Sequence, residues 1–72
     1  MMKQLKPVAA RQVRMFKIAN RRGYAAVCFN NLTEGASPLQ AYQRLMKAIR
    51  RTGGSLPELS AADASRLVVS RF

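Results

Sequence analysis

Five cations in the first third of the chain have the type and spacing to contact a polyanion. They follow one another at i, i+3, i+6, i+10 and i+11, and they are Arg11, Arg14, Lys17, Arg21 and Arg22. On a helix this spacing gathers several positive charges on one face, where they can meet successive phosphates or an acidic groove. No acidic residue interleaves with them, so they repel one another. We expect this face to contact a polyanion or an acidic partner.

A second basic set follows later in the chain and comprises Arg44, Lys47, Arg50 and Arg51. The same chemistry applies, although part of this charge also complements the C-terminal end of a helix. Ile18 is an apolar residue inside the first basic face, as a protein–protein anchor would be. Both basic sets and Ile18 are therefore the predicted partner- or nucleic-acid-binding residues.

The remaining inventory argues against catalysis. The 72 residues include 13 Lys and Arg, 3 Asp and Glu, and no His, which gives a net charge of +10. The usual general bases, His-based metal sites and nucleophile–His pairs are therefore missing or nearly so. We expect no enzyme, catalytic residue, metal, cofactor or small-molecule substrate, and we expect a polyanionic partner, because such a charge creates a strong positive field.

The single cysteine and the hydropathy pattern bear on the compartment. Cys28 cannot form an intrachain disulfide, which suits a reducing cytosol, and its neighbours Val27 and Phe29 favour a small buried side chain. No apolar run approaches the roughly 18 residues of a membrane span. We therefore expect a cytoplasmic protein without a membrane partner.

The sequence predicts that the elements that position these residues are helices. Residues 1–6 are predicted to be a flexible basic arm, and residues 7–72 a single helical domain. Pro7 suits a first helical position, and an amphipathic pattern continues to Arg22 before Gly23. In 24–33 the apolar residues favour a short helix that ends at Gly35, although a strand remains open because Val27 and its neighbours have good β propensity.

Helix-start signals are clearest in the second half. A helix is predicted to start at Ser37, which suits the N-cap position, with Pro38 as its first residue. Gln40 completes a capping box with Ser37, and the helix is expected to end at Gly53. Ser60 with Asp63 predicts a last helix, with an earlier start at Ser55 as the alternative. The sequence therefore predicts a mainly α fold, a single small domain of three to four short helices. The alternative is α+β, with a short two-stranded pairing of the 24–29 and 67–71 regions.

Two further patterns fit the sequence less well. Segments 24–33 and 38–52 have the layout of a helix-turn-helix, but Asn31 and Pro38 fit that motif poorly. The aromatic residues are expected in the core rather than as base-stacking platforms, because each lies on an apolar stripe. These are Phe16, Tyr24, Phe29 and Tyr42.

Over nearly its whole length the chain resembles a small phage family. The stretches concerned are Met2-Lys3-Gln4-Leu5-Lys6-Pro7, Arg21-Arg22-Gly23-Tyr24 and Ser37-Pro38-Leu39-Gln40. The sequence is similar to the RNA-polymerase-binding shut-off and antitermination proteins of Xanthomonas phages. This resemblance implies a regulator that binds host bacterial RNA polymerase, represses initiation and lets polymerase pass terminators beside the RNA exit channel. Nascent RNA and the host cytoplasm are the implied partner and place.

A different function class remains open beside that one. The same charge would suit a small basic DNA- or RNA-binding module, such as a repressor, that acts directly on nucleic acid. A structural basic protein of a ribonucleoprotein particle is a third possibility. Salt dependence separates these readings, because each neutralised phosphate on B-DNA contributes a slope of about −0.9 to the log–log plot of affinity against salt.

Overall fold

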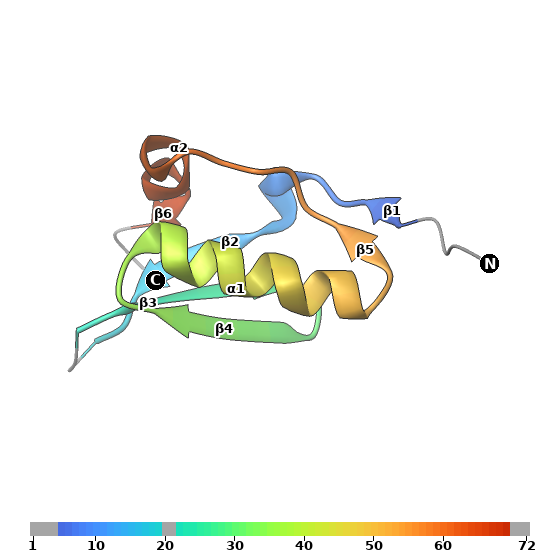
Figure 1. Cartoon of the computed structure of the whole chain (residues 1–72). Coiled ribbons are helices and arrows are strands. Elements are labelled where there is room, and N and C mark those ends of the chain that lie inside the picture. The colour runs from blue at the N-terminus through green and yellow to red at the C-terminus, as the bar shows by residue number, and fades with distance from the viewer. Residues whose placement is uncertain (1–4, 20–21, 70–72) are drawn as a thin grey trace.

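A four-stranded sheet with one long helix across it forms the centre of the molecule (Figure 1). The structure is a computed structural model and describes residues 5–19 and 22–69. Its elements in chain order are β1 (Lys6–Pro7), the 3₁₀ turn η1 (Ala10–Gln12), β2 (Arg14–Lys17), β3 (Tyr24–Cys28), β4 (Asn31–Gly35), α1 (Pro38–Arg51), β5 (Gly54–Ser55), α2 (Ala61–Arg66) and β6 (Val68–Val69).

The sheet has the strand order β4-β3-β2-β6. β3 pairs antiparallel with both β2 and β4, while β2 pairs in parallel with β6. Successive side chains of a strand point to opposite faces. Met15 and its register partner Ala26 therefore lie on one face, and Arg14, with its partner Val27, lies on the other. We call the first the core face and the second the open face.

The helix α1 covers the core face of the sheet, chiefly over β3 and β4 (Figure 1). Its start is fixed as the sequence predicts, because Ser37 Oγ accepts from the Gln40 N–H at 3.2 Å and Pro38 occupies the first turn. The Gln40 Oε1 accepts from the Ala36 N–H at 2.6 Å, one residue earlier than in a standard capping box. The buried core comprises Val13, Met15, Ala26, Cys28, Ala41, Tyr42, Leu45, Ile49 and Leu56.

Two short elements complete the fold at opposite ends of α1 (Figure 1). At one end β1 and β5 pair in parallel, and the Val8 N–H donates to the Ser55 carbonyl at 2.8 Å. At the other end α2 begins at the predicted Ser60 cap, whose Oγ accepts from the Asp63 N–H at 3.2 Å. The prediction of a helix near Ser60 is confirmed.

The mainly α fold class is wrong, and the first predicted helix is the main reason. Among the described residues between Val8 and Arg22 the structure has η1 and β2 instead of the predicted α-helix. Arg14 shares one face of β2 with Phe16, and Met15 shares the other with Lys17, so the strand does not separate apolar from basic residues as the predicted helix would. Packing against neighbouring strands therefore overrides the helical pattern. Residues 1–4 of the expected basic arm lie outside the described part of the chain, and Lys6 belongs to β1.

The predicted helix over 24–33 is also wrong, because this region is the β3–β4 hairpin. Its turn is Phe29-Asn30, and Phe29 has a φ of 54°. The α+β alternative expects 24–29 to pair with 67–71, but β6 pairs with β2, while β3 lies between β2 and β4. In the part of the chain that the structure describes, no helix is long and apolar enough to span a membrane.

Candidate polyanion-binding surface

The outward side of α1 carries four exposed cations within eight residues. Helical spacing turns the apolar side chains of α1 toward the sheet, and its polar ones outward. We define the basic face of α1 as Arg44, Lys47, Arg50 and Arg51, all of which are exposed. The sequence of α1 contains no acidic residue. This second predicted set is therefore presented on one side of one element.

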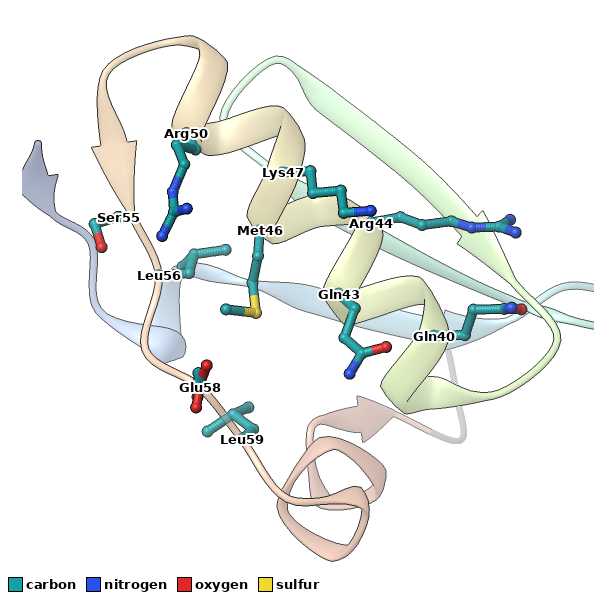
Figure 2. A pocket seen from close by; sticks show the side chains of 10 residues that line it. All are labelled: Gln40, Gln43, Arg44, Met46, Lys47, Arg50, Ser55, Leu56, Glu58 and Leu59. Atoms are coloured by element: carbon teal, nitrogen blue, oxygen red, sulfur yellow. The ribbon is translucent and has the colours of Figure 1, made fainter.

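A groove runs between this side of α1 and the chain segment that follows β5 (Figure 2). It has a volume of about 590 Å³. Arg50 and Met46 extend from α1 toward the segment, whereas Arg44 extends away from it. The lining residues are Gln40, Gln43, Arg44, Met46, Lys47, Arg50, Ser55, Leu56, Glu58 and Leu59. The groove thus combines cations with an apolar floor, formed by Met46, Leu56 and Leu59.

The wall opposite α1 is held at several points. Ser55 is tied to the start of the chain through its carbonyl and the Val8 N–H. Two residues later the Tyr42 hydroxyl donates to the Pro57 carbonyl at 2.6 Å. Between them Leu56 is only 5% exposed and belongs to the core. The groove is therefore formed before any partner arrives, and a preformed site reduces the ordering cost of binding.

Arg44 also connects α1 with the outer strand of the sheet. Its Nη1 donates to the Glu34 carbonyl at 2.8 Å. A second hollow on this side is lined by residues of the β2–β3 connection, β4 and α1, among them Ile18, Arg22 and Arg44. Gln40 and Arg44 line both hollows. Arg22, Arg44, Lys47 and Arg50 consequently belong to two adjoining hollows.

The first predicted basic set is not gathered on one face. Arg11 lies on η1, Arg14 lies on the open face, and Lys17 lies at the end of β2 on the opposite side of the strand from Arg14. All three are exposed. Arg22 is exposed, Ile18 is half-buried, and both line the second hollow. Arg21 lies outside the described residues. The strand period separates side chains that a helix would have aligned.

The groups with perturbed ionisation lie in the core and not on this surface. Burial raises the pKa of the Cys28 thiol above its ordinary value of 9.0. Burial, and secondarily the charge of Cys28, raises the pKa of the Tyr42 phenol above 10.0. Cys28 is a buried free cysteine, as its apolar neighbours predict. Among the residues described, no cluster of His, Cys, Asp and Glu could hold a metal ion. What the basic surface can do chemically is bind anions.

Sequence reasoning missed the groove floor and the position of Phe29. The sequence pattern singles out neither Met46 nor Leu59 as a binding residue, because the groove requires segment 55–59 to lie against α1. Phe29 was expected in the core, but it is 64% exposed at the hairpin turn. Tyr42 is fully buried, whereas Phe16 and Tyr24 are half-buried. No sequence signal marks Phe29 as exposed, since it follows the apolar run of β3.

Comparison with known protein families, curated proteins and solved structures finds no match to this chain.

Proposed function

We propose that this chain is a non-enzymatic, phage-encoded transcription regulator that binds host bacterial RNA polymerase through the basic face of α1. The observation that carries the proposal is the set of four exposed cations on one side of α1, beside a preformed groove. The choice of polymerase comes from the sequence resemblance. Regulation by occupancy needs no catalytic residue, which agrees with a chain that has three acidic residues and no His.

The proposed mechanism combines a protein contact with an electrostatic effect on RNA. The protein would act in the host cytoplasm, inhibiting initiation and promoting antitermination near the RNA exit channel. With α1 held against an acidic surface of polymerase, the remaining charge of this +10 chain would attract the emerging transcript. Holding the transcript in this way would oppose closure of a terminator hairpin.

The test compares two variants that each lose three positive charges. The first replaces Lys47, Arg50 and Arg51 with Gln, and the second replaces Arg11, Arg14 and Lys17 with Gln. Arg44 is left intact because its guanidinium bonds the Glu34 carbonyl. Gln preserves helix propensity, so α1 should persist. Tagged wild-type protein should capture RNA polymerase subunits from a nuclease-treated bacterial lysate, and mass spectrometry identifies them.

The α1 variant should lose about tenfold or more of the captured polymerase, since three exposed ion pairs at about 0.5 kcal/mol each amount to roughly one factor of ten. The variant at Arg11, Arg14 and Lys17 has the same net charge as the α1 variant, and it should retain most of the captured polymerase. Equal losses in the two variants would show that only net charge matters. A wild-type protein that captures no polymerase after nuclease treatment would exclude the proposed partner.

Direct binding to DNA or RNA is the second candidate function. It is favoured by Arg44, Lys47 and Arg51, whose spacing of i, i+3 and i+7 along α1 can follow a phosphate backbone. In that case the captured material would disappear on nuclease treatment. Affinity for an oligonucleotide would also fall with salt by a log–log slope near −0.9 for each phosphate contacted on a duplex.

A further inference from the structure

The groove beside α1 has a composition that a simple phosphate-binding face does not need. Its floor is made of Met46, Leu56 and Leu59, which come from two separate parts of the chain. Arg50 extends from α1 toward this floor, and Lys47 also lines the groove, with its side chain directed toward Arg44 (Figure 2). A phosphate chain would use the cations and leave the floor empty. The floor therefore indicates a ligand with apolar side chains.

The lining also argues against nucleic-acid bases as that ligand. Single-stranded nucleic acids bind mainly by stacking bases on aromatic rings inside a positively charged groove. None of the ten residues that line this groove is aromatic. Methionine, in contrast, is flexible and polarisable and suits surfaces that accept varied aliphatic side chains. The floor fits protein side chains better than bases.

Charge selects among possible protein ligands. Three cations line the groove, namely Arg44, Lys47 and Arg50, against the single carboxylate of Glu58. A second copy of this chain is a poor occupant, because both molecules would carry +10. An occupant with carboxylates beside apolar side chains satisfies the rim and the floor together.

We propose that the groove binds an acidic amphipathic segment of a partner protein, with its apolar side chains on Met46, Leu56 and Leu59 and its carboxylates toward Lys47 and Arg50. This inference rests on the proposed function in taking the partner to be a protein. It adds that recognition is partly apolar and that the partner offers a short acidic segment rather than a flat acidic surface.

The test uses three fluorescent probes on the full chain at physiological ionic strength. The first is a short peptide of alternating Glu and Leu, the second is the same peptide with every Leu replaced by Ser, and the third is a single-stranded RNA oligonucleotide. The Leu peptide should bind about tenfold more tightly than the equally charged Ser peptide, as buried apolar side chains contribute on this scale. Equal binding of the two peptides would overturn the proposal without any variant being needed.

Two variants locate the binding in the groove. Met46→Gln makes the half-buried floor polar. It should weaken binding of the Leu peptide several-fold and leave the affinities of the Ser peptide and the RNA unchanged. Glu58→Gln removes the groove's carboxylate and should therefore increase the affinity of both peptides. Far-ultraviolet circular dichroism establishes that each variant is folded. Leu-peptide binding that Met46→Gln leaves unaltered, or RNA binding tighter than that of the Leu peptide, would contradict the proposal.

Capture of polymerase by Met46→Gln separates this inference from the proposed function. If wild type and Met46→Gln capture polymerase equally, the proposed function stands and the groove is not the contact. If neither captures polymerase but the Leu peptide binds as expected, the groove assignment stands and the partner is another protein.

Discussion

The two faces of the four-stranded sheet meet their surroundings in opposite ways. On the core face α1 covers the strands, and side chains such as Met15 and Ala26 are completely buried. The open face is buried at Ala25 but reaches the protein surface at other positions, and Leu32 is 61% exposed. On the side of the molecule that α1 covers, four exposed cations lie on the outward face of the helix, where helical spacing aligns them. Arg14, on the open face, is carried by a strand and has no such alignment.

This difference shows how one composition produces two kinds of surface. The helix separates apolar from basic residues, so that side of the molecule has a sealed core beneath a charged exterior. The open face has no such separation, because Arg14 and Val27 are register partners on the same side of the sheet. Stability should therefore depend chiefly on the core face, whereas changes at the exposed positions of the open face should leave the fold intact.

The sharpest test replaces one leucine on each side. Leu45 of α1 is fully buried and Leu32 of β4 is 61% exposed. Leu45→Ala should lower the free energy of unfolding by about 2–5 kcal/mol, because it loses burial and leaves a cavity. Leu32→Ala should cost under about 1 kcal/mol. Urea denaturation of both variants measures the difference, and similar losses would mean that the open face is covered in solution.

Alkaline pH should lower the free energy of unfolding through two buried groups on the core side, Cys28 and Tyr42. Both groups have a pKa that burial raises in the folded state, so the unfolded chain releases these protons first. Their contribution is fully present below the ordinary thiol value of 9.0 and is lost as pH rises through the folded-state values. Urea unfolding over an alkaline series should show this decline.

The matched variant for the alkaline series is Cys28→Ala. It removes the thiol that titrates first, so its stability should decline less steeply than wild type just above pH 9.0. The comparison uses slopes, since the lost sulfur also lowers stability at every pH. Parallel curves for the two proteins would show that the Cys28 thiol makes no difference to alkaline unfolding.

The smallest expected effect concerns the hairpin turn beside the open face. Phe29 has a φ of 54°, a left-handed conformation that costs a residue with a side chain about 1–2 kcal/mol. Phe29→Gly relieves that strain, and Phe29→Ala removes the ring but keeps the strain. The Gly variant should be more stable than the Ala variant by under about 1 kcal/mol, because glycine also gains entropy on unfolding. Thermal denaturation of the pair would reveal equal stabilities if the turn is unstrained.

The helices were predictable because their signals are local. Ser37, Pro38 and Gln40 specify the start of α1 within four residues, and Ser60 does the same for α2. The aligned cations of α1 follow from the same periodicity. The groove does not, because it depends on contacts distant in sequence, such as the hydrogen bond between Tyr42 and the Pro57 carbonyl.

The strands were missed for equally specific reasons. β3 is buried on both sides at Ala25 and Ala26, so it lacks the alternation that marks a half-exposed strand. Its turn has no Asn-Gly or Asp-Gly pair, and Phe29 occupies the left-handed position instead. Gly23, with a φ of 131°, lies in the β2–β3 connection, whereas in sequence it resembles the glycine that ends a helix.

The hydrogen bond from Arg44 to the Glu34 carbonyl has a consequence for self-association. β4 is one of the two edge strands of the four-stranded sheet, and an exposed edge can template pairing with another chain. Because the guanidinium occupies one carbonyl of β4, an added strand would have to displace a charged side chain before it could pair there. This arrangement hinders edge-to-edge pairing of another chain along β4.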